Sequence, residues 1–248
     1  MKFNFDETLN HRTNASYRWG MEDFPEDVIG MGTADLDYEC APCIREALRP
    51  IVEENCYNYR QHTEEYYNAV IGWYKRNYGL DIKKEWLSNV PSTIGAVRIA
   101  LGIFAEPGDN VIVQTPVFSP IVWAIEGADC HQIDNPLKAV DGHYEIDFED
   151  FEAKIKATHP SLYLMVNPHN PTGKVFTKEE LTRLVDICYE NGVKIVSDEV
   201  HALVMYEDHK HTPILAVSDK AQEIAVQIVS LSKGFNYEPS ACHHYRCE

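Results

Sequence analysis

The sequence lacks long apolar runs and is poor in positive charge. It has no stretch of about 18 apolar residues, so we expect no transmembrane helix. The opening residues, MKFNFDETLN, contain no apolar core of a signal peptide, so secretion is not expected either. Lys and Arg total 22 against 39 Asp and Glu, a formal net charge of −17. Binding to nucleic acid or to anionic lipid depends on clustered positive charge, so we expect neither partner.

The sequence also lacks the even number of cysteines that is typical of a secreted, disulfide-rich protein. The seven cysteines are scattered over 248 residues, an odd count that favours a reducing cytoplasm. Cys40 and Cys43 have CxxC spacing, but no second pair follows in the register of a zinc ribbon. Cys242, His243, His244 and Cys247 complete a zinc site only on paper. We therefore expect ordinary thiols rather than zinc or redox chemistry.

The patterns of apolar residues that are present are those of an α/β protein. Residues 1–40 are irregular, and helical spacing of apolar residues predicts helices over Pro42 to about Glu54 and about Thr63 to Tyr78. From Asn89 onward, short apolar strands alternate with helical patterns, which is typical of a parallel sheet with crossover helices.

The clearest unit spans residues 161–200. An apolar strand from Ser161 to Val166 leads into a Pro- and Gly-rich loop over residues 167–173. Thr177 and Glu180 have the spacing of a capping box, which predicts the start of a helix. A second strand starts at Lys194. Ligands of open α/β sheets lie beyond the carboxyl ends of the strands, so the loops there hold the candidate site.

Three polar motifs follow strands in this half of the chain: Asn-Pro-His-Asn-Pro-Thr-Gly at 167–173, Ser-Asp-Glu-Val-His at 197–201 and Ser-Leu-Ser-Lys at 230–233. Taken singly, each has an ordinary explanation, namely a turn, a helix cap or a solvated lysine. Their joint occurrence, in this order and each at a strand end, is specific.

These motifs resemble those of the class I and II aminotransferase superfamily, the fold type I enzymes that depend on pyridoxal phosphate. Softer features favour the cystathionine β-lyase-like C–S lyase branch, among them the Ala34–Tyr38 segment and His201. The resemblance implies an α/β fold in three α/β/α layers with a mostly parallel sheet. It divides the chain into an N-terminal segment (1–40), an incomplete cofactor-binding large domain (41–236) and a tail (237–248).

The resemblance also implies roles for single residues in holding the cofactor. Lys233 is the expected Schiff-base lysine and the base that removes the Cα proton of the substrate. Asp198 is expected against the pyridine nitrogen, where a buried carboxylate keeps that nitrogen protonated. Asn170 is expected to donate to the phenolic oxygen of the cofactor, and His201 matches a position that often contacts the same oxygen.

Further residues match the phosphate and ring contacts of the family. A helix N-terminus offers amides to a phosphate, so Gly95, Ala96 and Val97 are expected there. Ser230 and Ser232 are expected to add hydroxyl groups, and Phe118 to stack on the pyridine ring. Tyr59, for which Tyr57 is a competitor, resembles a tyrosine that reaches the phosphate of a neighbouring subunit, which implies a homodimer.

The function that the resemblance implies is β-elimination on a small amino-acid substrate such as cystathionine, in the cytoplasm. An aminotransferase would use the same cofactor residues, so this alternative stays open. A non-catalytic remnant that at most binds the cofactor is the third alternative.

The chain departs from the family after Asn236. Residues 237–248 have no apolar strand pattern, and the smaller C-terminal domain with the arginine that binds the substrate carboxylate has no counterpart. Three explanations of this departure remain open, namely a frameshifted gene product, a truncated fragment and a genuinely short protein. We also expect poor solubility, because faces that the missing part covers would be exposed.

Overall fold

The computed structural model describes residues 4, 6–10, 18–19, 25, 27–58, 61–206, 209–237 and 242–246, with only the backbone described in the last range. The described residues form two compact units. One comprises those of Met1–Gln61 and Leu231–Pro239, and the other those of His62–Ser230 and Ser240–Glu248. The assignment of residues 41–236 to a single cofactor-binding domain stays a prediction.

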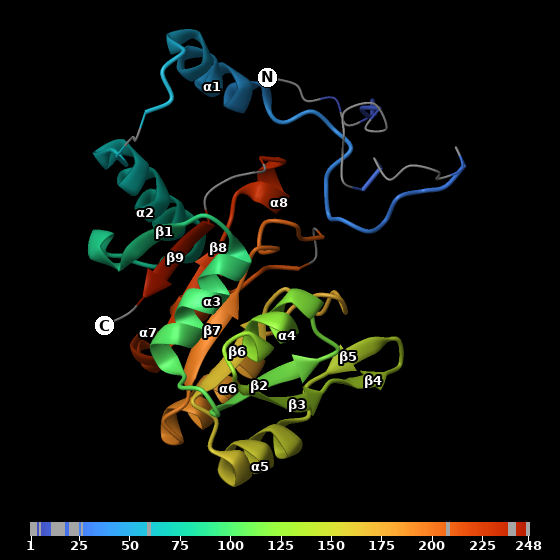
Figure 1. Cartoon of the computed structure of the whole chain (residues 1–248), viewed down its shortest axis with the longest axis vertical. Helices are drawn as coiled ribbons and strands as arrows, with labels where there is room; N and C mark the ends of the chain where they lie inside the picture. Colours follow the sequence, from blue (N-terminus) through green and yellow to red (C-terminus); the bar gives the residue numbers. More distant parts are fainter. Residues whose placement is uncertain are drawn as a thin grey trace. The chain divides into compact units, whose positions relative to one another are not determined.

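The second unit is built on a seven-stranded sheet in the order β1-β9-β8-β7-β6-β2-β3 (Figure 1). Strands β2, β3, β6, β7 and β8 pair in parallel, whereas β9 is antiparallel to both its neighbours, β1 and β8. All strands except β9 therefore run the same way. A small separate hairpin joins β4 and β5. The strands are β1 (Leu87–Val90), β2 (Asn110–Thr115), β3 (His131–Pro136), β4 (Lys138–Val140), β5 (His143–Glu145), β6 (Leu162–Val166), β7 (Lys194–Asp198), β8 (Ala225–Val229) and β9 (Cys242–Arg246).

Helices cover both faces of this sheet. The second unit contains α2 (Glu64–Tyr78), α3 (Thr93–Phe104), α4 (Ser119–Glu126), α5 (Phe148–Thr158), α6 (Lys178–Glu190) and α7 (Asp219–Ile224), with the 3₁₀ turns η2 (Lys84–Trp86) and η3 (Ile214–Ala216). The first unit contains α1 (Pro42–Glu54) and α8 (Ser232–Phe235). None of the described helices is long and apolar enough to cross a membrane.

The sheet separates two hydrophobic cores. Val111 and Val113 of β2 pack with residues of α3 and α4, while Ile112 between them packs with the cluster that includes residues of α5, α6 and α7. This division follows from the two-residue period of a strand, which sends successive side chains to opposite faces. The buried strands consist of apolar runs, as expected for a parallel sheet covered on both sides. The three-layer α/β/α fold with a mostly parallel sheet is thus confirmed.

The tail contains a strand that its sequence did not predict. Cys242–Arg246 form β9, whose backbone pairs with Leu87–Val90 on one side and Val226–Val229 on the other. Residues 237–248 have no apolar strand pattern, yet these five residues form a strand. Apolar alternation failed as a signal because backbone pairing to two neighbouring strands needs no particular side chains.

The capping box that begins α6 is present as predicted. The Thr177 side chain accepts from the Glu180 amide at 3.1 Å, and the Glu180 carboxylate accepts from the Thr177 amide at 2.8 Å. We expect Thr177→Ala to lower the free energy of unfolding by about 1 kcal/mol, since one amide loses its acceptor. Urea unfolding measures the change. Thr182→Ala, which lies on the same helix outside the cap, should cost less, and equal losses would contradict the role of the cap.

Candidate functional site

Backbone hydrogen bonds align the carboxyl ends of three central strands. Asn167, directly after β6, donates its amide to the Asp198 carbonyl at 2.9 Å. Glu199, directly after β7, donates to the Ile228 carbonyl of β8 at 2.8 Å. The polar motifs that follow these three strands therefore begin side by side at one edge of the sheet, where α/β proteins bind their ligands.

Asp198 ends β7 and is almost fully buried, with 5% of its surface exposed. Its Oδ1 accepts from the Val200 amide at 3.1 Å. Burial raises the pKa of this carboxyl from 3.8 to about 6, and the neighbouring Glu199 carboxylate adds to the rise. Because burial makes the charged form of this carboxyl unfavourable, a cationic N–H group of a ligand beside it would stabilise the carboxylate.

The loop after β6 is braced from inside. The fully buried Asn167 accepts from the Phe176 amide through Oδ1 at 3.0 Å, and its Nδ2 has no partner among the described residues. The His169 amide donates to the Lys174 carbonyl, and the Gly173 amide to the His169 carbonyl, both at 2.8 Å. These bonds hold the backbone on both sides of Asn170, whose side chain is left half-buried.

His169 fills the inside of this loop. It is 3% exposed, its Nδ1 lies 2.9 Å from the Thr172 hydroxyl, and its ring stacks on Phe176. Burial lowers the pKa of His169 from 6.5 to about 4, so the ring is neutral at physiological pH. No pattern in the sequence singled out His169. The reason is that a histidine between two Asn-Pro steps carries no periodic signal.

A buried pair of side chains, Glu199 and His211, was also not predicted from the sequence. The Glu199 carboxylate is buried and lies 2.7 Å from Nε2 of the buried His211. It also accepts from the Ser197 hydroxyl and the Ile214 amide, both at 2.9 Å. These contacts fasten the end of β7 to the start of η3. Only the fold brings Glu199 and His211 together, because they are twelve residues apart in an irregular segment.

His201 and Ser230 lie where the motifs predicted. His201 is half-buried in the turn after β7, and its carbonyl accepts from the Val204 amide at 2.9 Å. Ser230 directly follows β8 and is 6% exposed. The structure therefore brings Asn170, Asp198, His201 and Ser230 to neighbouring strand ends.

The start of α3 differs from the expectation in one respect. The Ser92 hydroxyl accepts from the Gly95 amide at 2.9 Å, and the Ala96 amide donates to the Ser92 carbonyl at 3.0 Å. Ala96 and Val97 are buried in the core. The Ala96 amide is thus bonded inside the helix, as is usual for the fourth residue of a helix, and its contact with a phosphate stays a prediction.

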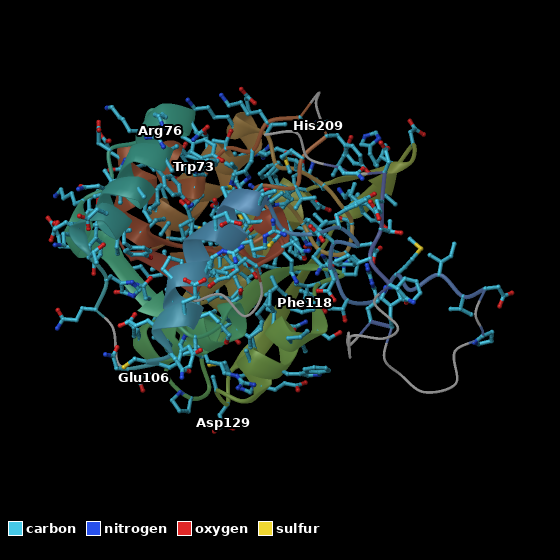
Figure 2. All side chains as sticks on the ribbon, turned by 90° about the horizontal axis from the view of Figure 1, so that it is seen from above. Trp73, Arg76, Glu106, Phe118, Asp129 and His209 are labelled. Carbon is cyan, nitrogen blue, oxygen red and sulfur yellow. The ribbon has the colours of Figure 1, made fainter. Side chains whose placement is uncertain are left out.

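Phe118 is the N-cap residue of α4, three residues past the end of β2. It remains 40% exposed, so plain core packing does not account for it. Glu106 precedes β2 and Asp129 precedes β3, so both lie at the amino ends of these strands. Phe118 follows the carboxyl end of β2 and lies apart from both residues in Figure 2. An exposed ring at the carboxyl edge of the sheet agrees with a stacking role, which stays a prediction.

The remaining predicted residues belong to the first unit or lie outside the described residues. Ser232 and Lys233 belong to α8 in the first unit, where Ser232 is 8% exposed and Lys233 is half-buried. Their placement relative to Asp198 stays a prediction. Tyr59 lies outside the described residues. No group of three or more His, Cys, Asp or Glu side chains suited to a metal ion occurs in the described part of the chain.

Comparisons with known proteins give this arrangement a context. The sequence profile described as "Aminotransferase class I and II" matches residues 26–238. The chain is 36% identical over 236 residues to "Cystathionine beta-lyase PatB" of Bacillus subtilis, covering 94% of this chain and 61% of that protein.

Two solved structures show the same likeness. A PLP-bound putative aminotransferase from Clostridium difficile superposes with a TM-score of 0.93 at 32% identity, over 99% of this chain and 64% of that one. The PLP-bound C-S lyase from Staphylococcus hominis gives a TM-score of 0.92 at 28% identity, over 100% and 64%. The chain thus spans less than two thirds of the length of these relatives.

Proposed function

Because the chain belongs to the class I and II aminotransferase family, we propose that it forms the cofactor-binding part of a pyridoxal phosphate-dependent carbon–sulfur β-lyase. The observation that carries the proposal is the buried carboxylate of Asp198 at the end of β7, beside the braced loop that presents Asn170. Relatives named as a cystathionine β-lyase and a C–S lyase favour elimination over transamination.

The described residues fit the cofactor in charge and in hydrogen-bonding capacity. A protonated pyridine nitrogen supplies the cation that the desolvated Asp198 carboxylate lacks. The Asn170 amide is the donor for the phenolic oxygen, and His201 lies in the next turn. When bound, pyridoxal phosphate supplies an electron sink for the charge that develops at Cα of an amino acid.

The phosphate would be held by hydroxyl groups and one amide. Ser230 is placed at the end of β8, and Ser232 follows two residues later. At the start of α3, a phosphate oxygen can replace the Ser92 hydroxyl as the acceptor for the Gly95 amide, because both are oxygen acceptors at a helix N-terminus. Phe118 would cover one face of the ring, and Tyr59 would reach the phosphate of a second subunit.

Lys233 has two tasks in this proposal. Its Nζ would hold the cofactor, and the same amine would remove the Cα proton of a bound substrate. The thiol then leaves from Cβ, and hydrolysis of the remaining three-carbon unit gives pyruvate and ammonia. The substrate is a cysteine S-conjugate such as cystathionine. The same family likeness supports a homodimer, and the odd, scattered cysteines support a cytoplasmic location.

The test is release of pyruvate from L-cystathionine by the chain loaded with pyridoxal phosphate, without any keto-acid acceptor. We expect pyruvate and homocysteine in equal amounts. Lactate dehydrogenase coupling measures the pyruvate, and a thiol reagent measures the homocysteine. Asn170→Ala should reduce the rate, whereas Asn77→Ala on the exposed surface of α2 should not. Turnover that requires a keto acid and releases no thiol would identify an aminotransferase and contradict the lyase proposal.

A further inference from the structure

Glu199 and His211 form a buried pair that the proposed lyase reaction does not use. Oε2 of Glu199 lies 2.7 Å from Nε2 of His211, and their side chains are 0% and 2% exposed. The other ring nitrogen, Nδ1, has no partner among the described residues. Such buried pairs often stabilise a fold no more than apolar side chains of similar volume would. Stability alone is therefore a weak explanation for this pair.

Glu199 is hydrogen-bonded through its backbone and through its side chain. Its amide donates to the Ile228 carbonyl of β8 at 2.8 Å, and its carbonyl accepts from the Ala202 amide at 2.9 Å. Oε1 accepts from the Ser197 hydroxyl and the Ile214 amide, both at 2.9 Å. Glu199 therefore ties the end of β7 to β8, to the turn that follows β7 and to the start of η3.

The carboxylates of Asp198 and Glu199 lie on opposite faces of the sheet. Side chains along a strand alternate between its faces, so Asp198 shares a face with Val196, which packs with residues of α3 and α4. Glu199 contacts His211, whose ring packs edge-on against Tyr78 of α2 with 6.3 Å between ring centroids. Tyr78 packs against the core on the other face, which includes residues of α5, α6 and α7. The pair therefore holds the chain from behind Asp198.

Glu199 also acts on Asp198 through its charge. Burial is the main cause that raises the pKa of Asp198, and the Glu199 carboxylate adds to the rise. The same carboxylate adds to the rise in the pKa of Tyr78, for which burial is again the main cause. Tyr78 and His211 thus face Glu199 from other elements, and Asp198 precedes it on β7. A shift of Glu199 would change both the position of Asp198 and the electric field around its carboxyl.

We propose that Glu199 and His211 are positioning residues for the Asp198 carboxylate. Held by His211, Glu199 fixes the backbone where β7 ends. This keeps Asp198 buried on the face that α3 and α4 cover, at the place proposed for the pyridine nitrogen of the cofactor. Neither residue touches the reacting atoms, and no covalent bond changes at either. The inference rests on the role proposed for Asp198.

The first part of the experiment uses the chain without cofactor, in a double-mutant cycle. Asp198→Asn should raise the free energy of unfolding at pH 8, because it removes a desolvated carboxylate. We expect this gain to fall to about half when Glu199→Gln is also present, since the carboxyl is then less buried and has lost a charged neighbour. Urea unfolding of the wild type, both single variants and the double variant measures the gain in each background.

His211→Leu separates position from charge. It removes the hydrogen bond to Glu199 but keeps the Glu199 carboxylate and much of the buried volume. If Glu199 acted by charge alone, the gain from Asp198→Asn would be unchanged or larger in this background. Positioning predicts a smaller gain, because Glu199 and the backbone beside Asp198 are then less firmly held.

Asp150→Asn is the matched control. The Asp150 carboxylate, on α5 of the same unit, accepts from Lys154 at 2.7 Å and from the buried Asn135 at 2.8 Å. Its loss should cost stability but leave the gain from Asp198→Asn unchanged, because substitutions at sites without shared partners add independently.

The second part measures the binding of two ligands by equilibrium dialysis. One is pyridoxal phosphate, and the other is its analogue with a carbon in place of the ring nitrogen. Glu199→Gln should weaken binding of pyridoxal phosphate about tenfold and binding of the analogue less than about twofold, because only the first ligand pairs with Asp198. In the Asp198→Asn background, Glu199→Gln should have no further effect.

Three results would overturn the proposal. One is an equal gain from Asp198→Asn in the wild type and in Glu199→Gln. Another is a smaller gain in Glu199→Gln but not in His211→Leu, which would reduce the effect to charge. The third is an equal loss of affinity for both ligands. A wild type that binds neither ligand would contradict the proposed function, and the first part of the experiment would still decide the role of the pair.

Discussion

Asp198→Asn is expected to stabilise the cofactor-free chain by about 3 kcal/mol above neutral pH. Burial raises the pKa of this carboxyl from 3.8 to about 6. Between these values the folded chain binds more protons than the unfolded chain, so the free energy of unfolding falls as pH rises from about 4 to about 6. The loss is then complete and constant. Two pKa units correspond to about 3 kcal/mol, and an uncharged amide avoids this cost.

Urea unfolding of both proteins at pH 4, 6 and 8 measures this effect. The gain from Asp198→Asn should be small at pH 4 and largest at pH 8. Asp81→Asn serves as a control, since Asp81 is an exposed carboxylate paired with Lys75 at 2.6 Å. It should show no gain that grows with pH. A gain for Asp198→Asn that is equal at all three values of pH would contradict desolvation as its cause.

The same substitution should have the opposite effect once pyridoxal phosphate is present. The carboxylate that destabilises the empty chain is the group that the proposed site requires for a cationic ring nitrogen. Binding should therefore stabilise the wild type more than Asp198→Asn, and thermal melts with and without cofactor would measure the difference. Such a reversal would tie the cost of burying Asp198 to cofactor binding rather than to folding.

Lys233→Ala is expected to abolish covalent attachment of the cofactor. The wild type mixed with pyridoxal phosphate should develop a visible absorbance band that survives gel filtration, because the cofactor is bonded to Nζ. In Lys233→Ala the band should be absent and the cofactor should separate from the protein. Lys220→Ala is a matched control, since Lys220 lies on the surface of the other unit and pairs with Asp186 at 2.6 Å. A band of equal strength in Lys233→Ala would place the attachment elsewhere.

Local signals in the sequence predicted much of the fold. The Thr177 capping box, the apolar run of β6 and the helix over Pro42–Glu54 depend on residues close together in the chain, and the structure contains all three. The three polar motifs also lie at strand ends as predicted. Their positions follow from chain order, because parallel strands joined by crossover helices all end at the same edge of the sheet.

Long-range pairing was not predictable in the same way. β9 joins the sheet through backbone hydrogen bonds to β1, more than 150 residues earlier, and its side chains show no apolar pattern. The buried pair of Glu199 and His211 depends on how an irregular segment folds back. The sequence around Ser92 located the start of α3, but the hydrogen bonds formed there determine which amides are available to bind a phosphate.

Reduction of the loaded protein with borohydride, followed by peptide mapping, tests the central claim most directly. Reduction fixes the cofactor to the lysine that carries it. The account predicts one pyridoxyl group per chain, on Lys233. A label on other lysines, spread without preference, or no label at all would contradict the claim that this chain forms a pyridoxal phosphate site.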